Sequence, residues 1–231
     1  MQPTRHSANR SEHRWSWPST MLLGGVGSAI LAAVLMSSPI VRAAEIVKAP
    51  NIAETTNAGG ANDSLPGTET IAEGRSIMNE IFKRRHSIRS FQSRKLKRQD
   101  LEAILAAADS APSAGGLKAR EMLLVADDAT KKRLVEAAHG QQFVAEAPVV
   151  IVFWAVPSRS AIKYGARGRD LFALQDATIA ASFAWLQAVA SGLAGCWVGA
   201  FDDEMVNKIF RDKIEADWRP IALLPVGYAV D

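Results

Sequence analysis

The chain has 231 residues, of which 48% are hydrophobic and 22% charged, a composition that excludes a wholly disordered, collagen-like or low-complexity protein. The formal net charge of +3 is too small to indicate nucleic-acid binding by itself. One cysteine, Cys196, excludes an internal disulfide and a cysteine-rich zinc module, and the histidines show no metal-ligand spacing, so we expect no metal site.

Residues 1–43 have the pattern of a secretory signal peptide. A polar segment with three arginines precedes an uncharged run over residues 21–40, and small residues then offer a cleavage site after Ala43. The alternative is a retained membrane anchor, because about 20 apolar residues are enough to span a bilayer. Either form exports the rest of the chain, to the periplasm or to the outer side of the inner membrane. Membrane contact is then expected through residues 21–40 if they stay uncleaved.

Residues 44–75 are rich in Ala, Asn, Thr and Gly and lack apolar periodicity, which predicts a flexible linker. The segment 76–231 has the length of one domain. Apolar residues at helical spacing predict helices around 77–82, from 99, over 129–139 and over 170–191, followed by one that Asp202 caps. Apolar runs predict strands at 122–125, 149–156, 196–201 and 221–230. This order predicts an α+β fold with a mixed sheet of about four strands flanked by helices.

The densest chemical signal is the basic segment 83–98, which has eight Lys and Arg residues and no acid. In an extended chain Arg85, Ser87 and Arg89 point to the same side. Guanidinium groups bind phosphate bidentately and a serine hydroxyl adds a donor, so this side suits a phosphorylated ligand. The alternative is a solvated basic helix end. We expect no nucleic acid, because Phe91 is the one aromatic residue within the segment.

Two other segments are rich in small residues. The loop 111–117, Ala-Pro-Ser-Ala-Gly-Gly-Leu, can bring bare backbone against a ligand, although an ordinary helix-to-strand turn has the same composition. The segment 195–202 places small residues before a helix cap, where a flat ligand can lie on backbone. Within it we expect Cys196 to be a buried structural thiol. The chain has no nucleophile elbow and no dinucleotide or phosphate-loop fingerprint.

Taken in order, these segments resemble the nitroreductase-like flavin oxidoreductases. The motifs are Arg-Arg-His-Ser-Ile-Arg-Ser-Phe at 84–91, the loop 111–117, Ala-Pro-Val-Val-Ile-Val at 147–152, Gln-Asp-Ala at 175–177, Gly-Cys-Trp-Val-Gly-Ala-Phe at 195–201 and Leu-Pro-Val-Gly-Tyr at 224–228. The resemblance covers residues 76–231. The loop glycines and the stretch 164–169 are most similar to the branch that includes the peptide azoline oxidases.

The resemblance implies an α+β sandwich that forms an obligate homodimer with FMN at the subunit interface. It assigns Arg85 and Ser87 to the FMN phosphate and Arg89 to the pyrimidine edge of the flavin. From the second subunit it assigns contacts to the loop residues Pro112, Ser113, Ala114 and Gly115. The backbone of Gly199 and Ala200 is assigned to the N5 edge of the flavin.

Many members of the family continue beyond the point where this sequence ends, into an extension that adds a second cation for the phosphate. We expect Arg84, Arg167 or Arg169 to take that role here.

The implied function is FMN-dependent oxidoreduction. The donor is a reduced nicotinamide, NADH or NADPH, or another envelope donor, and the acceptor is a small organic molecule such as a nitro or quinone compound. Two alternatives stay open. One is FMN-dependent dehydrogenation of a peptide or heterocycle substrate. The other is a membrane-tethered anion-binding module without redox activity.

Overall fold

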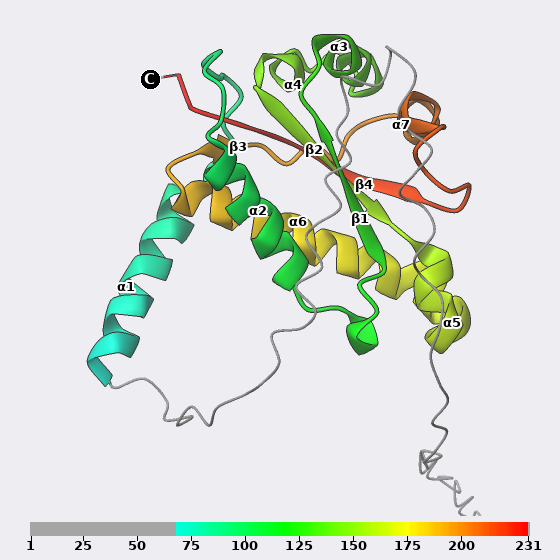
Figure 1. Cartoon of the computed structure of the whole chain (residues 1–231), viewed down its shortest axis with the longest axis horizontal. Helices are drawn as coiled ribbons and strands as arrows, with labels where there is room; N and C mark the ends of the chain where they lie inside the picture. Colours follow the sequence, from blue (N-terminus) through cyan, green and yellow to red (C-terminus); the bar gives the residue numbers. More distant parts are fainter. Residues whose placement is uncertain (1–67, 231) are drawn as a thin grey trace, which may run out of the picture. The chain divides into compact units, whose positions relative to one another are not determined.

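The computed structural model describes residues 68–230 (Figure 1). The expected signal or anchor over 1–43 therefore lies outside the described residues, as does the expected linker up to residue 67. Helix α1, Thr68–Arg84, begins before the domain boundary expected at residue 76, so the last part of the expected linker is helical. Within the described part of the chain, no helix is long and apolar enough to cross a membrane.

Four strands form one sheet in the order β1-β2-β4-β3. They are β1 Arg120–Val125, β2 Val149–Ala155, β3 Ala194–Gly195 and β4 Arg219–Gly227. The strand number agrees with expectation, but the direction differs from the expected mixed sheet, because the ladders between these strands are all antiparallel. A strand such as β2 is buried on both faces in either arrangement, so its composition does not reveal its direction.

Helices cover both faces of the sheet (Figure 1). They are α2 Arg98–Ser110 and α6 Ala173–Ala190 on one face, and α3 Asp128–Ala137, α4 Phe143–Glu146 and α7 Asp203–Phe210 on the other. Side chains of β2 alternate between the layers: Ile151 and Phe153 pack with α2 and α6, whereas Val152 and Trp154 pack with the opposite helices. The fold is therefore the expected α+β sandwich.

Helix α6 lies close to the sheet because its buried side is made of alanines. The fully buried members are Ala173, Ala177, Ala180, Ala181, Ala184 and Ala188. Such small side chains let the neighbouring helix α2 and the sheet approach its backbone. Two elements that the sequence did not predict precede it, helix α5, Pro157–Arg167, and the π-helical turn Gly168–Phe172.

The connection from β3 to α7 departs from the expected strand at 196–201. The β3 ladder ends at Gly195, and Val198 continues the pairing through a bridge to Leu223. Asp202 caps α7 as expected, since its carboxylate accepts a hydrogen bond from the Met205 N–H at 2.9 Å. Between the Val198 bridge and the Asp202 cap the chain turns away from β4, and residues 199–200 are exposed.

Candidate functional site

The motif after α1 runs along the edge of the sheet at β3. Ser87 forms a parallel bridge with Gly195, and the Ile88 N–H donates to the Gly195 carbonyl at 3.1 Å. Ile88 packs against the core, so its neighbours Ser87 and Arg89 lie at the surface. Phe91 is buried and bridges to Ala229. The motif is therefore held at both ends by backbone pairing.

Arg85 stacks on an aromatic ring of the central helix. Its guanidinium carbon lies 4.6 Å from the centroid of the Trp185 ring, a cation–π geometry. Trp185 in turn lies against β3, where a Cβ atom on Gly195 would stand 3.1 Å from the indole ring. No carboxylate pairs with Arg85 anywhere in residues 68–230. The guanidinium N–H groups are thus available for an anion.

Cys196 lies beside Ser87 and Arg89. Burial raises the pKa of the Cys196 thiol and outweighs the charge of Arg89 and a hydrogen bond with Ser87, which both lower it. Its Sγ atom also contacts the Trp197 carbonyl at 3.7 Å. A protonated, buried thiol is a packing group and not a nucleophile, as the sequence analysis expects.

Arg89 and Ala200 both lie near the segment that leads into α4. The Arg89 guanidinium carbon lies 5.9 Å from the centroid of the Phe143 ring. The Gln141 side-chain amide donates to the carbonyl groups of Ala200 at 3.2 Å and Ala138 at 3.0 Å. Gln141 therefore ties the exposed 199–200 backbone to the end of α3. The sequence analysis missed this residue, and no pattern along the chain indicates it.

The preceding turn is conformationally unusual. His139 has a φ of 56° and Gly140 a φ of 81°, so two successive residues occupy the left-handed region. This reversal brings the residues after α3 back toward the 199–200 backbone, where Gln141 binds.

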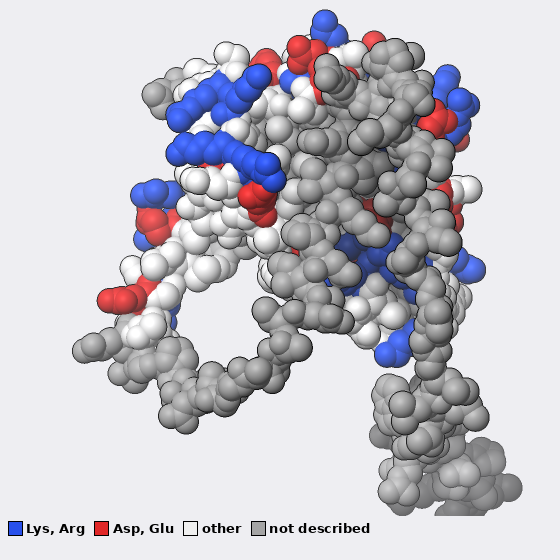
Figure 2. All heavy atoms as spheres, in the orientation of Figure 1, with Lys and Arg blue, Asp and Glu red and all other residues white. Residues whose placement is uncertain are grey.

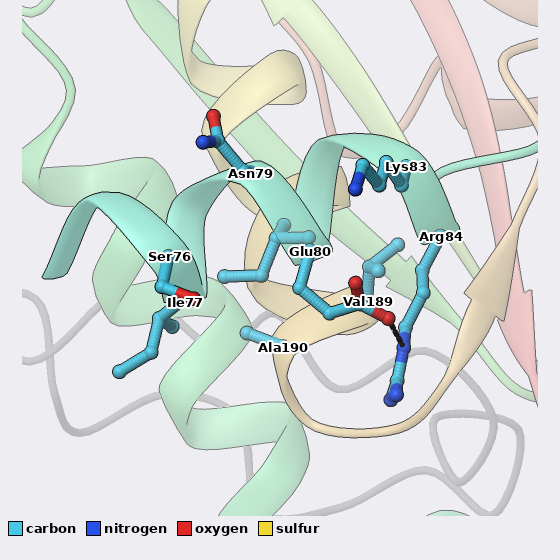
Figure 3. A pocket seen from close by; sticks show the side chains of 9 residues that line it. Ser76, Ile77, Asn79, Glu80, Lys83, Arg84, Val189 and Ala190 are labelled. Atoms are coloured by element: carbon cyan, nitrogen blue, oxygen red, sulfur yellow. Dashed lines mark hydrogen bonds and ion pairs between the residues drawn. The ribbon is translucent and has the colours of Figure 1, made fainter. Parts of the chain in front are cut away.

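Unlike Arg85 and Arg89, Arg84 pairs with an acid on its own helix. Its Nε atom donates to Glu80 Oε1 at 2.7 Å along α1. Both side chains line a hollow of about 540 Å³ between α1 and the C-terminal end of α6, where Val189 and Ala190 form the opposite wall (Figure 3). The charge of Arg84 is therefore already balanced on its own helix.

The rest of the basic segment is exposed. Figure 2 shows Lys and Arg side chains gathered over the corner where Figure 1 places the loop between α1 and α2. Arg94 lies over the Tyr228 ring at 4.1 Å, and Arg98 pairs with Glu102. Two of these cations have partners within the fold, and the Lys and Arg side chains over residues 94–98 are exposed, which agrees with a solvated basic segment there.

The loop 111–117 is held by two buried side chains. The Asp176 carboxylate of α6 accepts hydrogen bonds from the N–H groups of Ala114 at 2.9 Å and Ala119 at 3.0 Å. Arg120 donates to the carbonyl groups of Ala108, Asp109 and Ala111, at 2.9 to 3.0 Å. Asp176 and Arg120 are 2% and 4% exposed. The loop is therefore anchored from inside, while Pro112 and Gly115 face solvent.

The structure does not bring this loop to the motif within one copy of the chain. Asp176 binds the loop near the start of α6, whereas Arg85 contacts Trp185 of the same helix. At 1.5 Å per residue, Asp176 and Trp185 are about 14 Å apart along the helix axis. Arg85, Ser87 and Arg89 gather at the β3 edge, and Gly199 and Ala200 join them through Gln141. The loop residues Pro112, Ser113, Ala114 and Gly115 lie apart.

The two other arginines expected as extra phosphate cations, Arg167 and Arg169, belong to the segment before α6. Arg169 pairs with Asp170 at 2.9 Å, and Arg167 lies over the Phe172 ring at 5.3 Å. Like the loop, they lie near the start of α6 and not near Arg85.

The family model described as the nitroreductase family matches residues 82–147 and 139–228. The chain belongs to the nitroreductase family. A Thermus thermophilus protein named NADH dehydrogenase is 46% identical over 72 residues, which are 31% of this chain and 35% of that protein. A Bacillus subtilis FMN reductase [NAD(P)H] is 34% identical over 88 residues, which are 37% of this chain and 35% of that protein.

Solved nitroreductase structures share the fold. An FMN-dependent nitroreductase from Clostridium difficile superposes with a TM-score of 0.57 and 26% identity, over 65% of this chain and 87% of that one. A nitroreductase family protein from Clostridium novyi NT has a TM-score of 0.60 and 26% identity, over 67% of this chain and 86% of that one. The family that the sequence motifs indicate is thereby confirmed.

Proposed function

We propose that this nitroreductase-family chain is an FMN-dependent oxidoreductase that takes electrons from NADH or NADPH and reduces a small organic acceptor such as a nitro or quinone compound. Family membership supports the enzyme class, and the relatives named as FMN reductase and NADH dehydrogenase support the cofactor and the donor. The observation that carries the proposal is the arginine pair at the β3 edge. Arg85 and Arg89 flank the Ser87 hydroxyl, and neither guanidinium has a carboxylate partner in the described residues.

The donor set fits FMN. Arg85 and Ser87 offer charge-assisted and neutral hydrogen bonds of the kind that a phosphate dianion accepts. The Trp185 ring limits the rotamers of Arg85, so little side-chain entropy is lost when an anion binds. Arg89 supplies positive charge for the edge of the flavin on which negative charge develops during reduction. The exposed backbone of Gly199 and Ala200 lets a flat ring approach closely.

When bound, FMN supplies hydride and electron transfer between donor and acceptor, and the protein contributes binding, orientation and electrostatics. Arg89 and Phe143 hold one wall of the site, and Gln141 keeps the 199–200 backbone in position. No side chain of the chain is required as a nucleophile, which agrees with the protonated state of Cys196.

A homodimer is part of the proposal. Helix α1, which borders the hollow, exposes apolar side chains, among them Ile77, Met78 and Phe82. Phe183 of α6 is also exposed. Burial of such side chains favours association. A second copy also supplies a loop 111–117 to each site, which one copy cannot do for itself because Asp176 holds its loop at the far end of α6.

Purification of residues 44–231, followed by extraction and identification of the bound cofactor, tests this function. We expect a yellow protein that contains FMN and oxidises NADH or NADPH in the presence of a nitroarene or quinone. A colourless protein that stays colourless after incubation with excess FMN would contradict it.

Export of the chain is a separate proposal. Its support is the uncharged run over 21–40 behind a basic segment, a pattern typical of secretory signals. The mass of the mature N-terminus in fractionated cells tests it. Cleavage after Ala43 or an intact anchor in the membrane fraction is expected, and an uncleaved chain in the cytoplasmic fraction would contradict it.

A further inference from the structure

The side chains of Lys163 and Tyr164, near the end of α5, lie against the loop 111–117 at the exposed residue Gly115. A Cβ atom on Gly115 would stand 2.9 Å from Lys163 Nζ and would collide with Tyr164 Oη, so both side-chain tips lie directly on the loop. Gly115 has a φ of 61°, a left-handed conformation that glycine adopts without strain. Lys163 and Tyr164 are therefore neighbours of the loop surface that the proposed function places against the flavin of the second subunit.

Two aromatic rings and two cations lie next to one another at the end of α5 and in the π-helical turn that follows. The Tyr164 and Phe172 rings pack edge to face with centroids 5.1 Å apart. Lys163 Nζ lies 5.4 Å from the Tyr164 ring, and the Arg167 guanidinium lies 5.3 Å from the Phe172 ring. Each ring thus has a cation on it, and both cations are exposed to solvent.

The charged side chains around Lys163 and Arg167 form ion pairs, but within the described part of the chain Lys163 and Arg167 do not. Arg159 pairs with Glu121, Lys118 with Asp109, and Arg169 with Asp170. In residues 68–230 no carboxylate forms an ion pair with Lys163 or Arg167. Two unpaired cations beside an aromatic pair present a surface that attracts a planar ring carrying a negative group.

We propose that Lys163 and Arg167, with Tyr164 and Phe172 between them, form a subsite for the anionic group of an aromatic electron acceptor, such as a carboxylate-bearing nitroarene or quinone. This inference rests on the proposed function, because that function places the loop, and with it Lys163 and Tyr164, beside the flavin. A nicotinamide donor with an additional phosphate offers the same chemistry, so the experiment separates acceptor from donor.

The test compares two acceptors of similar size in the purified flavoprotein, anionic 4-nitrobenzoate and neutral 4-nitrobenzyl alcohol. We expect kcat/KM to favour 4-nitrobenzoate, and Lys163→Met combined with Arg167→Met to reduce the anionic-to-neutral ratio about tenfold. Replacement of both residues by Glu is expected to invert the preference. The matched control is Arg211→Met, an exposed cation at the end of α7, which should leave the ratio unchanged.

A binding measurement that needs no turnover accompanies the kinetics. Titration with benzoate and with benzamide, followed by the absorbance spectrum of the flavoprotein or by tryptophan fluorescence, should give tighter binding of benzoate, and this preference should weaken at high salt. The methionine variant should bind the two compounds equally.

Three outcomes would overturn the inference. The first is equal kcat/KM for the two acceptors together with equal binding of benzoate and benzamide. The second is a ratio that the paired variants leave unchanged. The third is a change in the ratio of NADPH to NADH activity without a change in the acceptor ratio, which would assign the cations to the donor. A protein that lacks flavin and reduces neither acceptor would contradict the proposed function instead, and the benzoate titration would still decide the subsite.

Discussion

The guanidinium of Arg85 lies over the indole of Trp185, with 4.6 Å between its central carbon and the ring centroid. This contact joins the motif after α1 to the central helix across 100 residues of sequence. The indole also lies close to the backbone of Gly195, where a side chain would crowd the ring. Arg85 is thereby pre-positioned at the β3 edge beside Ser87.

Replacement of Arg85 by Met should weaken FMN binding strongly. A charge-assisted hydrogen bond contributes about 1.5–3 kcal/mol, so we expect the Kd to rise about ten- to a hundredfold. Trp185→Leu should produce a smaller increase, because it frees the guanidinium without removing it. Fluorescence titration of the apoprotein with FMN measures both effects. An unchanged Kd in Arg85→Met would show that the phosphate binds elsewhere.

Removal of the Asp176 carboxylate should destabilise the fold and release the loop 111–117. Two N–H groups, the buried one of Ala119 and the partly buried one of Ala114, lose their acceptors in Asp176→Ala, which costs about 2–4 kcal/mol in the free energy of unfolding. Urea denaturation measures the change. Asp170→Ala is the matched control, since its exposed pair with Arg169 should contribute nothing measurable. Equal stability of the two variants would contradict this role.

Two inactive variants should restore function when they are co-expressed. If each site takes Arg85 from one copy and the loop from the other, a mixed dimer of Arg85→Met and Pro112→Glu chains contains one intact site and one doubly altered site. We expect the separate homodimers to bind little flavin and the mixed dimer to approach half occupancy. Flavin content per chain and reductase activity are the measurements. Absence of any recovery in a verified mixed dimer would mean that the loop serves its own chain.

Cys196 should react slowly with thiol reagents in the folded protein. Burial raises the pKa of its thiol, so the reactive thiolate is scarcer in the folded state than in the unfolded chain at the same pH. We expect modification by a chromogenic disulfide at pH 8 to be much faster in denaturant than in buffer. Cys196→Ser, which lacks the thiol, supplies the blank. Rapid modification of the native protein would contradict the packing role.

The helices and strands follow largely from local patterns. Apolar periodicity predicted α2, α3, α6 and β2 to within a few residues, and the carboxylate of Asp202 identified the start of α7. The strand expected at 196–201 and the unpredicted helix α5 were two of the local failures, and the short helix α4 was also not predicted. In the first case β4 pairs with residues 194–198 and not beyond, and in the second Gly165 and Gly168 interrupt the helical pattern.

By itself, the sequence determined the family and the sandwich class, because those properties depend on residue type and spacing along the chain. Only the tertiary structure decided which motifs meet. Pairing at the β3 edge joins Ser87 to Gly195, and Gln141 holds the 199–200 backbone beside them. Hydrogen bonds to Asp176 keep the loop 111–117 at the opposite end of α6. These contacts link residues from distant parts of the chain, and such pairings depend on packing geometry that no local pattern records.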